Sequence, residues 1–273
     1  MMKITKIIAC IILIPLGLLA LVCVVSQFIP PHPPSDFVIT HNIVDLSQIY
    51  TVSKFRSCDG HETVPAWSDE PHSNTQHYFY GKPGIGDGQL AIYAPFDGYV
   101  FDGGPEGISI YPLSTQFPWW WMNQWRLSVL HSKVLPQFEG WPHKVTAGTL
   151  LGYATKEDPN QQFESMDVRV GVLALPPECK DHNCEPYKKM DSIFNYMSDA
   201  VFAEYQKAFP GLTNRQDMII SKEMRLSNTC QFQGDGPYFS DGQDQFVQEH
   251  VFTGVRVGDT STEKQRMNEL FQH

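Results

Sequence analysis

Four side chains that can bind a metal ion or move a proton stand in short, turn-bounded stretches. His77 lies in NTQHYFYGKP, His131 ends RLSVLH, Asp167 lies in SMDVRV and His61 lies in SCDGHETV. Imidazole and carboxylate groups are common ligands of catalytic zinc, which needs three protein ligands and an open position for water. A neighbouring histidine can then act as general acid or base. These residue types are therefore compatible with metal-assisted hydrolysis.

Each of these residues also has a plain structural interpretation. His77 stands among three aromatic residues, where a partly buried histidine bound to a backbone carbonyl is expected. His131 fits an inward-facing strand residue, and Asp167 alternates onto one face with Arg169, which suggests a cross-strand ion pair. His61 follows a cysteine and fits a turn held by a disulfide. The residue types alone leave both interpretations open.

Size and charge limit the class of protein. The chain has 273 residues, of which 42% are hydrophobic and 12% aromatic, so it can bury a sizeable core. Its formal net charge is -10, and no basic stripe offsets it. Binding to the phosphate backbone of nucleic acids is therefore not expected.

The N-terminal segment predicts a membrane anchor. Residues 7–25 form an uncharged apolar run behind Lys3 and Lys6, long enough to cross a bilayer as a helix with the N-terminus in the cytoplasm. A cleaved signal peptide is the alternative, but no small-x-small site follows the run. We predict a signal anchor over residues 1–29, a proline-rich linker over 30–36 and a main domain that is periplasmic or extracellular.

Cysteine usage agrees with an oxidising compartment. Two of the six cysteines lie in the apolar run, and four lie outside it. We predict two disulfides, a local one between Cys179 and Cys184 and a long-range one between Cys58 and Cys230. Zinc binding by CKDHNC, with His182 between the thiols, is the alternative, but no second pair of ligands follows at useful spacing.

The pattern between residues 37 and 185 predicts a mainly β domain, an antiparallel β-sandwich. Short β-branched or aromatic runs recur, each bounded by Gly, Pro, Asp or Asn. The runs are FVIT, LAIYAPFDGYVFDGG, GISIYPL, WRLSVLHSKVL, GTLLGYA and MDVRVGVLAL. In the last run Asp167 and Arg169 share one face while Val168 and Val170 share the other, a period of two.

Residues 186–273 predict a C-terminal extension packed on the same domain. Apolar residues recur at helical spacing over 188–209, with Asp191 as a plausible N-cap, which predicts one helix. DMIISKEMR is expected to form a further strand, and STEKQRMNELFQH a short terminal helix.

A tryptophan cluster in FPWWWMNQW raises three possibilities. Tryptophans can stack on sugars, lie at a membrane interface or plug the end of a sandwich. The aromatic binding surface expected from the first of these would comprise Trp119, Trp120, Trp121 and Trp125.

The order of signals between residues 77 and 172 resembles the lysostaphin-type zinc endopeptidases, whose fold is the duplicated hybrid motif. HYFYG is followed by YAPFDGYV, then by GISIYP, RLSVLH and VTAGTLLGYA. The family's first zinc ligand matches His77. The histidine that acts on the zinc-bound water in this family matches His131. The family's aspartate falls on Gly81, and its His-x-His falls on Ser165 and Asp167.

The resemblance implies a peptidase-like domain acting on cell-wall peptides. Zinc would be held by His77 and Asp167 with one further donor, and His131 would act as general acid or base. The further donor would be His61, with Glu62 or Asp87 as alternatives. A second hypothesis is a catalytically inactive binding or scaffold module of the envelope on the same fold.

Overall fold

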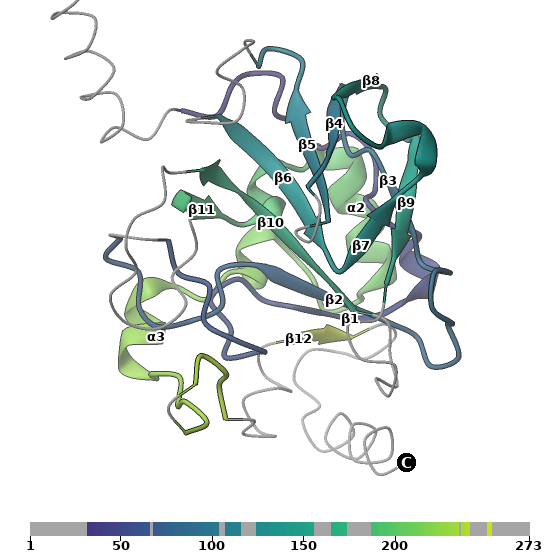
Figure 1. Cartoon of the computed structure of the whole chain (residues 1–273). Coiled ribbons are helices and arrows are strands. Elements are labelled where there is room, and N and C mark those ends of the chain that lie inside the picture. The colour runs from purple at the N-terminus through teal and green to yellow at the C-terminus, as the bar shows by residue number, and fades with distance from the viewer. Residues whose placement is uncertain are drawn as a thin grey trace, which may run out of the picture.

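The computed structural model places two antiparallel sheets and a few short helices (Figure 1). It describes residues 32–65, 68–103, 107–115, 124–155, 165–173, 187–234, 236–240 and 250–252. The predicted anchor and terminal helix, the Cys179–Cys184 pair and Trp119 to Trp121 lie outside these ranges. Within them, no helix is long and apolar enough to cross a membrane.

The larger sheet has nine strands, all paired antiparallel. In spatial order eight of them are β12 (His250–Phe252), β1 (Ile49–Ser53), β2 (His77–Gly81), β10 (Ser165–Leu173), β6 (Trp125–Leu130), β5 (Ile108–Pro112), β4 (Gly98–Asp102) and β8 (His143–Val145). The ninth, β11 (Tyr187–Asp191), also pairs with β10.

The smaller sheet has three strands in the order β3 (Ala91–Tyr93), β9 (Leu150–Ala154) and β7 (Ser132–Val134). The helices are α2 (Asp199–Ala208) and α3 (Lys222–Ser227), with 3-10 turns η1 (Leu46–Gln48), η4 (Pro136–Phe138), η5 (Ile193–Tyr196) and η6 (Arg215–Met218). In Figure 1, α2 lies behind β6 and β10, whereas α3 lies at the lower left of the molecule.

The two faces of the larger sheet differ in character, as the residues of β10 show. Val168, Val170 and Val172 point to one side, while Asp167 and Arg169 point to the other, as the period of two predicts. We call the first side the core face and the second the polar face. Residues of β10 on both faces are buried, so the polar face is covered as well.

The core face packs against the smaller sheet and α2. Helix α2 buries Val201, Phe202 and Tyr205, the spacing expected for one face of a helix. The ring of Tyr205 contacts Phe79 of β2 and Phe194 of η5, with centroid separations of 6.5 and 5.2 Å. These aromatic contacts fix α2 against the middle of the larger sheet.

The prediction of a mainly antiparallel β domain is confirmed, and the alternation in β10 is as expected. The predicted helix is shorter than its apolar pattern. Its first residues form β11 and η5, and α2 begins only after Ser198, whose Oγ accepts a hydrogen bond from the Val201 amide. Ser198 caps the helix instead of Asp191, because β11 extends to Asp191 as an edge partner of β10.

The strand predicted for DMIISKEMR is wrong. This segment forms part of η6 and α3, and Ser221 caps α3 by accepting from the Met224 amide. Local capping by short polar side chains outweighs the β-branched pair between them. FVIT is also not a strand, since Ile39 makes only an isolated bridge to Met197.

The predicted Cys58–Cys230 disulfide is confirmed, with Cα atoms 5.3 Å apart across a sequence separation of 172. The buried Arg225 guanidinium lies beside it. Arg225 Nη1 is 2.7 Å from the Cys58 sulfur and also donates to the carbonyl of Asn228, while Nε donates to the carbonyl of Arg56. The disulfide and this arginine tie the start of the domain to the segment after α3.

We expect the double variant Cys58→Ser/Cys230→Ser to lose about 2 to 5 kcal/mol of unfolding free energy, since the disulfide closes a long loop in the unfolded chain. Urea unfolding under oxidising conditions measures the loss. Wild type under reducing conditions is the control and should approach the double variant. An unfolding midpoint unchanged by the double substitution would contradict the prediction.

Candidate functional site

His77 lies on the core face of the larger sheet. In the pairing of β2 with β10, His77 stands opposite Val168, whereas Tyr78 stands opposite Asp167. His77 Nδ1 is 2.8 Å from the Ser53 carbonyl oxygen, and Nε2 is 2.9 Å from Ser192 Oγ. A carbonyl oxygen only accepts, so Nδ1 carries the proton and Nε2 accepts from the Ser192 hydroxyl.

Both ring nitrogens of His77 are therefore engaged inside the domain. Its side chain is fully buried, and the rings of Phe55 and Phe194 lie against it with centroids 6.0 and 5.1 Å away. Burial lowers the pKa of His77 to about 4, against a smaller opposing effect of the Ser53 carbonyl. His77 is a neutral structural residue in this arrangement.

Asp167 lies on the polar face and is fully buried. Its Oδ2 accepts a hydrogen bond of 2.9 Å from Gln76 Nε2 and lies 3.4 Å from His131 Nε2. Its Oδ1 is also buried and has no hydrogen-bond partner among the residues that the structure describes. The two carboxylate oxygens are thus in unlike environments.

His131 reaches Asp167 through an unusual backbone conformation. Strict alternation along β6 would place it on the core face with Leu127 and Val129. Instead its φ of 52° lies in the left-handed region, at the turn between β6 and β7, and its imidazole lies beside Asp167. Non-glycine residues in this region are often found at functional sites. The His131 side chain is 23% exposed.

Gln76 connects Asp167 to a buried arginine. Its Nε2 donates to Asp167, so its Oε1 is free to accept from Arg169 Nε in a short hydrogen bond. Tyr78 lies beside the same groups. Burial, followed by the nearby Asp167 and Asp59 carboxylates, raises the pKa of Tyr78 well above its usual value, so its hydroxyl stays protonated.

His61 belongs to a turn that covers this end of the polar face. His61 Nδ1 is 2.9 Å from the Tyr78 hydroxyl, and the Tyr80 hydroxyl donates to Asp59 Oδ2 over 2.9 Å. Gly60 has a φ of 67°, and a Cβ there would stand 2.4 Å from Tyr78 Oη. Only glycine allows the turn to approach so closely.

The residues present do not fit the expected zinc site. Of the predicted set, the structure brings together His131 and Asp167. His77 lies on the opposite face of the sheet, and His61 lies beside the Tyr78 hydroxyl. No group of three His, Cys, Asp or Glu side chains within the described ranges could hold a metal ion. A zinc site needs at least three such donors.

Trp125 does not belong to an aromatic binding surface. It pairs with Val172 on the core face and is 2% exposed. Its ring lies 5.8 Å from that of Phe37 and 5.6 Å from that of Tyr196. The other three tryptophans of the predicted surface lie outside the described residues, so Trp125 alone is assigned, as a core residue.

Sequence reasoning did not single out Gln76 or Arg126. Arg126 lies further along the polar face, where its Nε and Nη2 both donate to the Tyr187 hydroxyl over 3.1 and 2.8 Å. Ser109 and Ser128 share a hydrogen bond of 3.1 Å on the same face. The alternation along β6 could have predicted the place of Arg126, because Arg126 and Ser128 lie on the same side of this strand.

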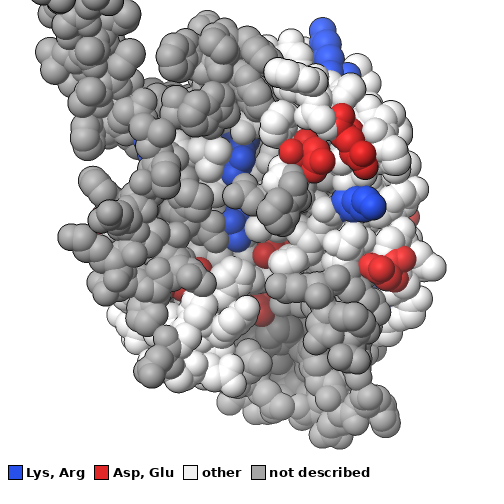
Figure 2. Space-filling view, in the orientation of Figure 1, with Lys and Arg blue, Asp and Glu red and all other residues white. Residues whose placement is uncertain are grey.

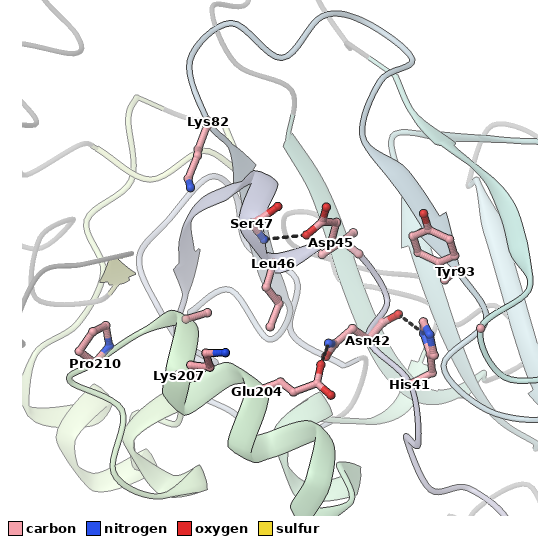
Figure 3. A pocket seen from close by; sticks show the side chains of 13 residues that line it. His41, Asn42, Asp45, Leu46, Ser47, Lys82, Tyr93, Glu204, Lys207 and Pro210 are labelled. Atoms are coloured by element: carbon pink, nitrogen blue, oxygen red, sulfur yellow. Dashed lines mark hydrogen bonds between the residues drawn. The ribbon is translucent and has the colours of Figure 1, made fainter.

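A separate groove of about 1080 Å³ opens between η1, β3 and the C-terminal half of α2 (Figure 3). Charges of both signs line it, and Asn42 donates a short hydrogen bond to Glu204 within it. The lining includes Asp45, Ser47, Lys82, Tyr93, Glu204 and Lys207. Figure 2 likewise shows acidic and basic side chains interspersed over the coloured part of the visible face.

Comparison with known proteins gives only distant likeness. No family model and no curated protein matches this sequence. Among solved structures, the M23 metalloprotease pseudoalterin from the deep sea is 16% identical, with a TM-score of 0.30, over 54% of this chain and 79% of that one.

Two further solved structures are similar at the same level. Helicobacter pylori Csd3 is 13% identical, with a TM-score of 0.33, over 80% of this chain and 46% of that one. Lysostaphin is 10% identical, with a TM-score of 0.27, over 45% and 49%. This chain therefore spans about half the length of these two.

The buried His77 makes a pH-dependent contribution to stability. Its pKa is about 4 when folded and near 6.5 when unfolded, so the unfolded chain takes up the proton first as pH falls. The contribution is complete above pH 6.5 and is lost between pH 6.5 and 4. The full loss is about 3 kcal/mol at roughly 1.4 kcal/mol per pH unit.

Urea unfolding of wild type and His77→Gln at several pH values between 7.5 and 4 tests this prediction. The variant should lose stability less steeply than wild type over this range. His41→Gln, which alters an exposed histidine, is the matched control and should keep the wild-type slope. A His77 imidazole that titrates near pH 6.5 by NMR would contradict the assignment.

Proposed function

We propose that this chain is a membrane-anchored, extracytoplasmic domain of the cell envelope. It binds cell-wall peptides beside His131, the partly exposed residue at the edge of the covered polar face, without hydrolysing them through zinc. One observation carries the proposal. His77 is turned into the core, while His131 and Asp167 meet on the opposite face of the same sheet. A metal ion cannot be shared by side chains on opposite faces of a sheet. A peptide group could approach Asp167 only where His131 is partly exposed.

The polar face suits peptide recognition. It carries guanidinium, amide, carboxylate, imidazole and phenol groups, and these are held in place by hydrogen bonds to one another. Binding sites typically combine a few such fixed polar groups with aromatic surface. Peptides present the complementary amide, carboxylate and amine groups.

The proposed location draws on the N-terminal sequence and on the cysteines. The apolar run behind Lys3 and Lys6 is the expected anchor. The Cys58–Cys230 disulfide is of the kind that persists outside the cytoplasm. The acidic net charge is compatible with such a domain and argues against nucleic acid as the partner.

Zinc-dependent hydrolysis of wall peptides is the second candidate function. The observation in its favour is the pairing of His131 with Asp167, at positions that the resemblance to lysostaphin-type enzymes assigns to the active site. It requires a third donor beyond the described residues. Zinc content and product release therefore separate the two candidates.

The decisive experiment combines sedimentation with purified cell walls and metal analysis of the full chain in detergent. We expect wild type to pellet with the walls, to carry no stoichiometric zinc and to release no soluble fragments. Arg169→Gln should weaken binding at least tenfold, about 1.4 kcal/mol, because it removes a charge from the polar face.

Lys207→Gln is the matched control, because this exposed lysine lies in the groove beside α2, away from the polar face. It should bind like wild type. Stoichiometric zinc together with released fragments would establish the hydrolase instead. Failure of the folded wild type to pellet with walls would remove the envelope-binding function.

A further inference from the structure

We infer that the polar face recognises a protonated primary amine, with Asp167 Oδ1 as its acceptor, so that the ligands are peptides carrying a free amino group on a side chain. This inference rests on the proposed function and adds the chemical class of the ligand. It begins from the unequal environments of the two carboxylate oxygens of Asp167.

A buried carboxylate oxygen without a partner is costly. Leaving a buried acceptor unpaired destabilises the folded state, and more so when the group is charged. Most such groups in folded proteins are paired, so an exception calls for a missing donor. Asp167 Oδ1 is such an exception among the described residues.

The hydrogen-bond donors next to Asp167 lie beside atoms other than its Oδ1. Gln76 Nε2 donates a hydrogen bond to Asp167 Oδ2. The amide is held in this orientation because its Oε1 accepts a hydrogen bond from Arg169. His131 Nε2 also lies next to Oδ2. The Tyr78 hydroxyl is within hydrogen-bond distance of His61. The geometry therefore leaves Oδ1 to a donor that comes from outside this set.

An ammonium group matches these requirements. It donates up to three hydrogen bonds, and a bond between an ammonium and a carboxylate is about twice as strong as one between neutral groups. It is a compact charge on a flexible aliphatic stem, and it can lie against an aromatic ring such as that of Tyr78. Among the residues that the structure describes, a metal ion would find only His131 and Asp167 here.

The approach to Asp167 leads past His131. Gln76, Tyr78, Asp167 and Arg169 are all buried, whereas the His131 side chain is 23% exposed. The imidazole therefore stands between the buried carboxylate and solvent, at the turn where its backbone is left-handed. A ligand amine that reaches Oδ1 must alter the surroundings of this ring.

The test uses two short peptides with blocked termini, identical except that one contains lysine and the other norleucine. The lysine side chain is then the single amine. NMR titration of the full chain in detergent at pH 7 follows the ring signals of His131. We expect the lysine peptide to bind at least tenfold more tightly than its norleucine twin and to shift these signals.

Asp167→Asn should abolish the preference for lysine, and Glu204→Gln, which alters an exposed carboxylate of the groove, should leave it unchanged. Equal affinity of wild type for the two peptides would overturn the inference and leave Oδ1 to a bound water.

The peptide comparison on wild type needs no variant, so a poorly folded Asp167→Asn does not block the test. Its failure is also distinct from failure of the proposed function. If walls still pellet the protein while the two peptides bind alike, amine recognition alone is refuted. If walls do not pellet the protein, the envelope-binding function itself is refuted.

Discussion

The structure depends on one constraint, which is that β10 is buried on both faces while its residues alternate between apolar and polar. Its valines complete the core against α2 and the smaller sheet. The alternation then forces Asp167 and Arg169 into the opposite, covered layer, where charged groups are tolerated only when hydrogen-bonded. Gln76 bridges the two charges, and the strand pairings fix its place. The candidate site follows from this requirement.

The cover over the polar face is built from segments distant in sequence. The Cys58–Cys230 disulfide joins the turn at Gly60 to the chain after α3, and Arg225 fills the space beside the sulfurs. The turn can rest on Tyr78 only because residue 60 lacks a side chain. Covalent closure and close backbone approach thus stabilise this layer together with a small apolar cluster of Cys58, Cys230, Phe232 and Phe239.

Much of the fold could be predicted from local pattern, but the site could not. The alternation in β10, the strands that became β4, β5, β6 and β9, and the Cys58–Cys230 pair are all visible in the sequence. The sequence does not show which residues of β2 face the core. Four consecutive residues from His77 are all buried or half-buried, and polar and apolar residues do not alternate among them. Likewise, the stretch RLSVLH does not predict that His131 follows the strand in a left-handed backbone conformation. Both features are set by pairing partners far along the chain.

Residue type is therefore a weaker guide to function here than hydrogen-bond satisfaction. His77 is the residue most suited by type to hold a metal ion, yet Ser53 and Ser192 use both of its nitrogens, and its low pKa follows from that burial. A group whose hydrogen bonds are complete serves the fold. Asp167 is the opposite case, since one oxygen is held by Gln76 and the other is buried without a partner among the described residues. The incomplete group is where the protein still has binding free energy to gain, so a ligand is expected there.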